Sequence, residues 1–232
     1  MNAATPLLSI KNLSVAFHTS TSNVKAVDQV SFEIQKGEIV GLVGESGSGK
    51  SITARAILGL LPSVAVTQGE ILYQNTNLLT LTQKQLQAYR GGTISMIFQE
   101  PMSALNPVFR CGRQVMEALL VHKKVEKQKA KQDTLSWLAE VGLKDTERIF
   151  NAFPHQLSGG QRQRIMIAMA MITSPQLLLA DEPTTALDVT VQKSILQKLK
   201  ELQKHKELAI LFISHDLGVV ANVNWIFHTN RK

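Results

Sequence analysis

Residues 44–51 constrain the fold more strongly than any other part of this 232-residue sequence. They read Gly-Glu-Ser-Gly-Ser-Gly-Lys-Ser and fit the pattern G-x-x-x-x-G-K-[ST], in which a glycine-rich loop joins a strand to a helix. The apolar run before the loop predicts a buried strand at residues 38–43. The residues after it predict a helix at 51–60, which Pro62 ends.

A loop of this kind can hold phosphate groups. Glycines let successive backbone N–H groups converge on phosphate oxygens, and the positive end of the following helix points at the same place. The lysine adds charge for the β- and γ-phosphates, and the last serine can ligate Mg²⁺. A glycine-rich turn without function is the alternative, but the flanking strand and helix favour a nucleotide site. The predicted nucleotide-binding residues here are Gly44, Glu45, Ser46, Gly47, Ser48, Gly49, Lys50 and Ser51.

Strands and helices alternate along most of the chain, which predicts an α/β fold with a mainly parallel sheet. Hydrophobic residues make up 44% and charged residues 19%, so one large domain can bury a core. Residues 101–153 interrupt the alternation with a helical pattern, which we interpret as an insertion. The other expected strands are 8–15, 26–34, 69–73, 93–98, 177–180 and 209–213, and the other expected helices are 161–172 and 189–204.

The net charge of +7 favours either a polyanionic partner or simple solubility. Five lysines between residues 122 and 131 are expected to lie all round a helix, and a solvated helix is favoured over a nucleic-acid face because no aromatic residues are interleaved. Cys111 is the only cysteine, which excludes internal disulfides. Apolar runs are too short to span a membrane and no secretory signal is visible, so we expect a soluble cytoplasmic protein.

Two adjacent carboxylates, Asp181 and Glu182, follow the apolar run at residues 177–180. Where a parallel strand ends beside a phosphate loop, the first carboxylate can hold a metal ion and the second can polarise an attacking water. A solvated turn is the alternative interpretation. Together with the loop, the pair predicts Mg-dependent nucleotide hydrolysis, but it does not separate kinases, GTPases and motor proteins.

A second anion-binding turn, Leu-Ser-Gly-Gly-Gln at residues 157–161, opens a predicted helix, and His215 follows a later strand. With these motifs in this order, residues 7–222 resemble the ATP-binding subunits of ABC transporters. The resemblance identifies residues 44–51 as Walker A and 177–181 as Walker B. It also identifies Gln99 as the Q-loop, the segment Leu157, Ser158, Gly159, Gly160 and Gln161 as the signature, Ala186, Leu187 and Asp188 as the D-loop, and His215 as the switch histidine. Phe17 is identified as a ring that stacks on adenine, although a lone Phe near a strand end is more often a core residue.

The resemblance implies an ABC cassette with a parallel core sheet, an N-terminal antiparallel β region and an inserted helical subdomain. It implies one domain, with an α/β core at 1–98 and 157–232 and a helical subdomain at 99–156. ATP and Mg²⁺ are the implied cofactors, with Ser51, Gln99 and Asp181 at the metal and Glu182 and His215 as catalytic residues. Two ATPase subunits would trap ATP between the Walker A of one and the signature of the other.

Residues 98–107, 153–164 and 180–192 look most like the peptide/nickel importer branch. The implied function is import of a peptide-like solute or nickel, at the cytoplasmic face of the inner membrane. The implied partners are a second ATPase subunit, identical or different, two permease subunits and, indirectly, a solute-binding protein, with no nucleic acid. An ABC-type ATPase of DNA repair or translation would predict tandem cassettes or a long coiled coil, and neither is visible.

The resemblance ends near Asn222, where family members usually continue into another strand. The sequence instead reads Asn-Val-Asn-Trp-Ile-Phe-His-Thr-Asn-Arg-Lys, so we expect that strand and the usual C-terminal extension to be absent; Trp225, Ile226 and Phe227 would form only a short apolar segment. A frameshift, premature stop or truncated gene is the first explanation and a naturally short variant the second. The competing function is therefore a hydrolysis-deficient remnant or an interaction-only subunit.

Overall fold

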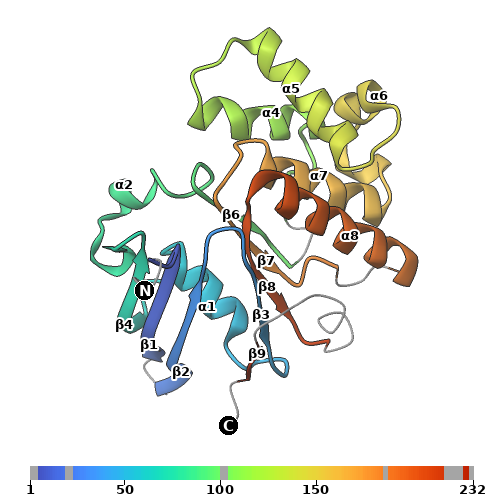
Figure 1. Ribbon diagram of the computed structural model, residues 1–232. Helices are drawn as coiled ribbons and strands as arrows, with labels where there is room; N and C mark the ends of the chain where they lie inside the picture. Colours follow the sequence, from blue (N-terminus) through green and yellow to red (C-terminus); the bar gives the residue numbers. More distant parts are fainter. Residues whose placement is uncertain (1–4, 19–22, 100–103, 185–187, 217–226, 230–232) are drawn as a thin grey trace.

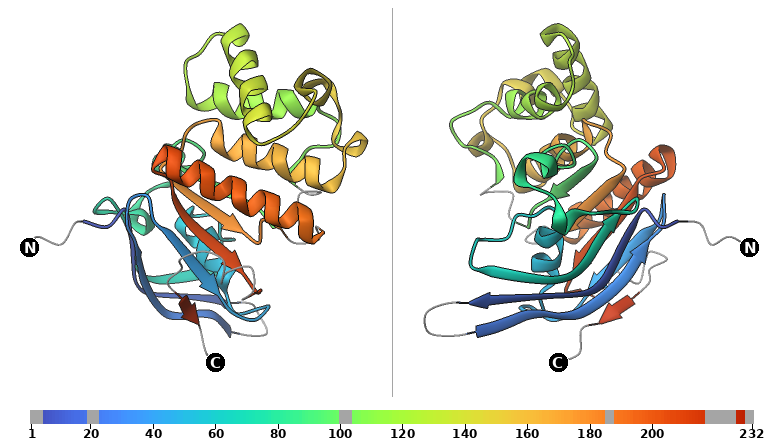
Figure 2. Two further views of the ribbon diagram at one scale, coloured as in Figure 1. Left: turned by 45° about the vertical axis from the view of Figure 1, so that its right-hand side comes forward. Right: turned by 90° about the vertical axis from the view of Figure 1, so that its left-hand side faces the viewer.

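The computed structural model describes residues 5–18, 23–99, 104–184, 188–216 and the backbone of 227–229. These residues form an antiparallel sheet, a parallel sheet and a group of helices (Figures 1 and 2). In the antiparallel sheet, β1 (Leu8–His18) lies between β2 (Asn23–Ile34) and β4 (Ala65–Tyr73), and β5 (Thr76–Asn77) forms one edge.

The second sheet has five parallel strands in the order β6-β7-β8-β3-β9. Because all its strands run in one direction, their carboxyl ends meet at a single edge, where ligands of open α/β sheets bind. The strands are β6 (Ile94–Ile97), β7 (Leu177–Asp181), β8 (Ala209–Ser214), β3 (Ile39–Val43) and β9 (Phe227–Thr229).

The parallel sheet is buried on both faces, as its nearly continuous apolar strands require. In β7, Leu177 and Leu179 contribute to a core that contains the antiparallel sheet and helix α1 (Lys50–Ile57). Leu178 and Ala180 point to the opposite face, because successive side chains of a strand alternate. That face is covered by α7 (Gly159–Met171) and α8 (Val189–Lys206) (Figure 1).

The inserted helices pack beyond α7, at the end of the molecule farthest from the antiparallel sheet (Figure 1). They are α4 (Cys111–His122), α5 (Lys127–Glu140) and α6 (Thr146–Asn151), followed by the 3-10 turn η2 (Pro154–Gln156). The α/β class, the parallel core sheet, the N-terminal antiparallel region and the helical insertion are therefore as the sequence predicts. No helix in the described part of the chain combines the length and apolar character needed to cross a bilayer.

Four local expectations differ from the structure. Helix α1 ends at Ile57 rather than residue 60, because Gly59 adopts a left-handed conformation (φ 60°) before Pro62 is reached. The lysine-rich segment is not one helix, since α4 ends at His122 and α5 begins only at Lys127. Between β4 and β6, the sequence interpretation missed β5, the turn η1 (Leu78–Thr80) and α2 (Gln83–Leu86).

The fourth difference concerns the end of the chain. The sequence predicted that the strand after residue 222 is absent, but β9 pairs in parallel with β3, with Gly41 opposite Phe227 and Val43 opposite Thr229. Three residues without proline can add backbone hydrogen bonds to an available strand edge whatever their side chains, so the absence of the family-like sequence did not prevent pairing. Trp225 and Ile226 lie outside the described residues.

Candidate functional site

The glycine-rich loop joins β3 to α1 and has space for a ligand. Gly47 (φ 82°) and Gly49 (φ 87°) are both left-handed, a conformation that glycine adopts without strain. A side chain at Gly47 would meet no atom within 4 Å, whereas one at Gly49 would collide with the carbonyl oxygen of Ala26 in β2. The loop is thus pressed against β2 on one side and open on the other, which fits a phosphate lying against its backbone.

Lys50 is the first residue of α1 and is only 7% exposed. Its ammonium donates hydrogen bonds to the carbonyl oxygens of Gly44 (2.8 Å) and Glu45 (2.7 Å) across the loop. Burial holds the pKa of Lys50 below its usual value, partly offset by Glu182 and Asp181. A buried cation held by neutral carbonyl groups lies where phosphate charge would stabilise it.

Ser51 and Asp181 bring the loop and β7 together. The Ser51 hydroxyl donates a 2.8 Å hydrogen bond to Oδ1 of Asp181, whose side chain is almost fully buried. Burial raises the pKa of Asp181, and the hydrogen bond from Ser51 partly opposes this. A hydroxyl and a carboxylate are oxygen ligands of the kind Mg²⁺ prefers, so the pair fits one side of a magnesium–phosphate site.

Glu182 lies next to Asp181 in a left-handed conformation (φ 47°), which is uncommon for a residue with a side chain. Its Oε2 accepts a 3.0 Å hydrogen bond from Nε2 of Gln99, and its Oε1 lies 3.0 Å from Nδ1 of His215. Its backbone N–H donates to the carbonyl of Ile213 in β8. The left-handed turn therefore places the carboxylate between the ends of β6 and β8, with the side chain 10% exposed.

These contacts follow from the strand order. β6, β7, β8 and β3 are neighbours, so the residues after their carboxyl ends converge at one edge of the sheet (Figure 1). The structure brings together five predicted residues from four strand ends: Lys50, Asp181, Glu182, Gln99 and His215.

Phe17 is the penultimate residue of β1. Its side chain is partly buried against the core that contains the antiparallel sheet and α1. It pairs across the sheet with Val24 in β2 and Ala65 in β4. Val24 is two residues from Ala26, which contacts Gly49 of the loop. Phe17 is thus near the loop. Its packing against the core also fits the alternative interpretation, in which Phe17 is a core residue.

The signature segment forms the N-terminus of α7. Ser158 is the N-cap: its Oγ accepts from the backbone N–H of Gln161 (3.3 Å), and Gln161 Oε1 accepts from the N–H of Ser158 (3.0 Å). Gly160 has room for no side chain without displacing Val191 of α8. Across the described ranges, no hydrogen bond or ion pair joins residues 157–161 to the phosphate loop, so the structure does not unite these two predicted anion sites within one chain.

The D-loop is described only at Asp188. Asp188 caps α8, and its Oδ1 accepts a 2.9 Å hydrogen bond from the N–H of Val191. Ala186 and Leu187 lie outside the described residues.

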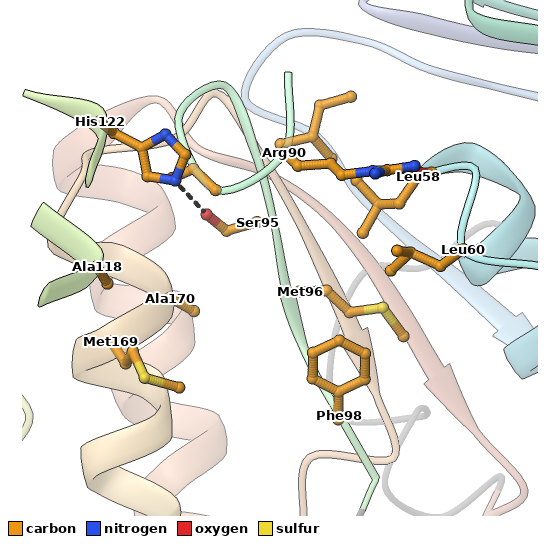
Figure 3. A pocket seen from close by; sticks show the side chains of 12 residues that line it. Leu58, Leu60, Arg90, Ser95, Met96, Phe98, Ala118, His122, Met169 and Ala170 are labelled. Atoms are coloured by element: carbon orange, nitrogen blue, oxygen red, sulfur yellow. Dashed lines mark hydrogen bonds between the residues drawn. The ribbon is translucent and has the colours of Figure 1, made fainter. Parts of the chain in front are cut away.

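A groove between the core and the inserted helices was missed by the sequence interpretation. Its cavity measures about 260 Å³ and is lined mainly by apolar side chains of α1's end, β6, α4 and α7, including Leu60, Phe98 and Met169 (Figure 3). Arg90 braces one wall by donating to the carbonyls of Leu58 (2.6 Å) and Gly59 (2.8 Å). A side chain at Gly91 would collide with the imidazole of His122, but the sequence pair Gly91–Gly92 does not by itself indicate a groove.

Comparison with known proteins places the chain in a family. A family model described as ABC transporter matches residues 27–185. A dipeptide transport ATP-binding protein of Bacillus subtilis is 52% identical over 219 residues, which are 94% of this chain and 65% of that protein. A peptidoglycan transport ATP-binding protein of Agrobacterium fabrum is 53% identical over 217 residues, 93% of this chain and 40% of that protein. The chain thus spans from two fifths to just under two thirds of these relatives.

Solved structures agree with the fold. The ATP-binding cassette MJ0796, solved as a dimer in a post-hydrolysis state with ADP and Pi, has a TM-score of 0.84 and 29% identity, covering 95% of this chain and 93% of that one. The subunit cbiO1 of Clostridium perfringens, part of an ABC transporter complex, has a TM-score of 0.77 and 25% identity, covering 96% and 84%. The predicted cassette fold is confirmed, and with the family model matching more than half of its length, this chain belongs to the ABC transporter family.

Proposed function

We propose that the chain binds and hydrolyses ATP and thereby energises import of a peptide-like solute, or nickel, through a membrane permease. One observation carries the ATPase proposal: Asp181, bonded to Ser51 of the phosphate loop, adjoins Glu182, which lies between Gln99 and His215. An oxygen pair for a metal ion and a second, mostly buried carboxylate for water thus lie side by side, as Mg-dependent hydrolysis requires.

Each residue has a proposed role in this site. The loop N–H groups and Lys50 would bind the β- and γ-phosphates, and Ser51, Asp181 and Gln99 would hold Mg²⁺, which when bound neutralises phosphate charge. Glu182 would orient water and accept its proton, and His215 would donate a hydrogen bond to the γ-phosphate. Phe17 would stack on adenine. Most of the rate enhancement would come from electrostatic stabilisation of charge on the transferred group.

The signature is proposed to act on a second subunit. Ser158 and Gly160 open α7 with an anion-binding helix end, yet they are not joined to the loop of their own chain. A head-to-tail pair would place this helix end against the phosphates held by a partner, with Asp188 close to the same interface. The dimeric structure of MJ0796 supports a pairing of two such subunits by analogy.

We further propose that residues 99–156 form a docking subdomain on the α/β core of residues 1–98 and 157–232. The apolar groove between them would receive one of two permease subunits, which in turn would meet a solute-binding protein. The chain would then be peripheral to the cytoplasmic face of the membrane. The names of the peptide-transport relatives support a peptide-like solute.

The decisive experiment measures phosphate release by the purified chain with Mg-ATP, with Mg-ADP and with ATP plus a chelator. Release that requires both Mg²⁺ and ATP is expected, alone or on adding partner subunits. Nucleotide binding without release in both conditions would contradict the ATPase proposal and favour a hydrolysis-deficient remnant. Release in the presence of partners only would identify a subunit that depends on its complex.

A further inference from the structure

The connection between α4 and α5 carries an unusual concentration of positive charge. Lys123, Lys124 and Lys127 are all exposed, and no carboxylate within the described ranges pairs with any of them. Val121, two residues before Lys123, is 71% exposed, more than any other large apolar side chain in the described part of the chain. We call Val121 and the three lysines the basic tip.

The charge of the basic tip contrasts with that of the helix after it. Lys129 pairs with Asp133 at 2.7 Å, and Lys131 pairs with Glu147 of α6 at 3.1 Å. Carboxylates thus pair with Lys129 and Lys131, whereas within residues 121–127 Glu126 is the only carboxylate against three lysines. Three exposed lysines without a paired carboxylate in the described part of the chain therefore lie within five residues, at the α4–α5 connection and the first residue of α5.

The basic tip lies next to the groove between the core and the inserted helices. Ala118 and His122 of α4 line the groove (Figure 3). The α4–α5 connection, which begins after His122, runs along the outer edge of the helical region (Figure 1). If a permease occupies the groove, as proposed above, the tip lies at the rim that faces the membrane. This step rests on the proposed function, but the charge and exposure of the tip do not.

We propose that the basic tip binds the anionic headgroups of the membrane that holds the permease. Each lysine near an anionic leaflet strengthens partitioning by about fivefold, and an exposed apolar side chain among lysines suits the headgroup boundary. All three cations are lysines, whose compact ammonium groups can interact with the phosphates of many headgroups without a defined geometry. None is an arginine, whose planar fork would suit a defined carboxylate of a protein partner.

Vesicle co-sedimentation tests the proposal with the full chain. The protein should bind vesicles of phosphatidylcholine and phosphatidylglycerol in equal parts, should not bind phosphatidylcholine alone, and should be released by salt. Replacing Lys123, Lys124 and Lys127 together by Gln should weaken binding by about 100-fold, since three fivefold contributions multiply. The matched control replaces the exposed lysines Lys11, Lys193 and Lys204 by Gln, which changes net charge equally and should alter binding less than about fivefold.

A fluorescent label locates the contact. Cys111 is fully buried and burial raises the pKa of its thiol to about 11, so a cysteine introduced at Val121 should be labelled selectively. An environment-sensitive dye there should shift to the blue on anionic vesicles, and the same dye at Val66, in the antiparallel sheet, should not.

Three results would overturn the proposal: equal binding to neutral vesicles, equal losses in the tip and control triples, or a tip triple that binds like the wild type. A tip triple that loses binding to polyglutamate while keeping vesicle binding would assign the tip to an acidic polypeptide instead. Because these assays contain no nucleotide, their failure is distinct from failure of the ATPase proposal. ATP binding measured in solution should be the same in the tip triple and the wild type.

Discussion

The Ser51 hydroxyl donates a hydrogen bond to the Asp181 carboxylate across 130 residues of sequence, at an O–O distance of 2.8 Å. Ser51 lies in the first turn of α1, and Asp181 is the last residue of β7. Because Asp181 is 1% exposed, its negative charge is held in the interior by a neutral donor and by more distant cations. The negative charge of Asp181 would therefore be stabilised by a bound cation. Without a cation, burying this charge lowers the stability of the fold.

Replacing Asp181 by Asn should stabilise the protein in the absence of nucleotide and Mg²⁺. A carboxyl whose folded pKa is raised stabilises the fold below its unfolded pKa, near 3.8, and this contribution is lost as pH rises through the folded pKa. At neutral pH the wild type therefore carries the cost of the ionised group, which Asn removes while still accepting from Ser51. The melting temperature should rise by about 2–4 °C for each kcal/mol recovered.

The pH dependence provides the control for this substitution. Thermal melts of the wild type should lose stability relative to Asp181→Asn as the pH rises above about 3.8 and through the raised folded pKa of Asp181. Added Mg-ATP should raise the melting temperature of the wild type but not of the variant. A variant that melts lower than the wild type at neutral pH would contradict the electrostatic explanation.

Lys50→Ala should weaken ATP binding by about 10- to 100-fold, because hydrogen bonds to charged groups contribute about 1.5–3 kcal/mol each. Titration of a fluorescent ATP analogue measures the effect. Lys36→Ala is the control, since Lys36 is an exposed lysine paired with Glu207 far from the loop, and its affinity should not change. Normal ATP affinity in Lys50→Ala would count against the phosphate-binding role.

Glu182→Gln should keep ATP binding and lower turnover by about 10²- to 10⁴-fold, the range for loss of a general base. The amide retains the size of the side chain and can still bond Gln99, but it cannot accept a proton from water. Phosphate release and ATP affinity are to be measured on the same preparation. Unchanged turnover would remove Glu182 from the role of base.

Two glycine substitutions separate backbone strain from collision. Gly47→Ala and Gly49→Ala both force a left-handed conformation, at a cost of about 1–2 kcal/mol. Only at Gly49 does the added methyl group collide, with the Ala26 carbonyl, which should cost about 1–3 kcal/mol more. Denaturant unfolding should therefore show Gly49→Ala to be the less stable variant, and equal stabilities would contradict the observed packing of the loop on β2.

Much of this site could be predicted from the sequence because its residues lie next to strong local signals. Three motifs each include the end of a strand or the start of a helix: the glycine-rich loop, the apolar run before Asp181 and the turn at Ser158. The sequence alone therefore indicates at which end of a strand or helix each of their residues lies. The convergence of Gln99 and His215 on Glu182 needed the strand order β6-β7-β8, which local patterns do not contain.

The groove and β9 could not be predicted, for different physical reasons. The groove depends on how α4 and α7 pack against β6, and its lining residues come from four separate segments. β9 depends on backbone pairing with β3, which its three residues do not encode in a hydrophobic pattern. The break at residues 123–126, between two helical patterns, was hidden by a run of lysines that are compatible with a helix.

Ser158→Asp should separate the capping role of Ser158 from its proposed role toward a partner's phosphate. Asp and Ser are comparable N-caps, so the variant should keep the hydrogen bond from the Gln161 N–H and melt close to the wild type. Ser158→Ala, which loses the cap, should lower stability by about 1 kcal/mol. Because the added carboxylate would face a γ-phosphate of like charge, Ser158→Asp should abolish ATP-driven dimerisation and turnover while ATP still binds the loop of its own chain. Size-exclusion chromatography with the Glu182→Gln substitution in both samples measures the dimer, and dimerisation equal to that of Glu182→Gln alone would show that Ser158 does not act across a subunit interface.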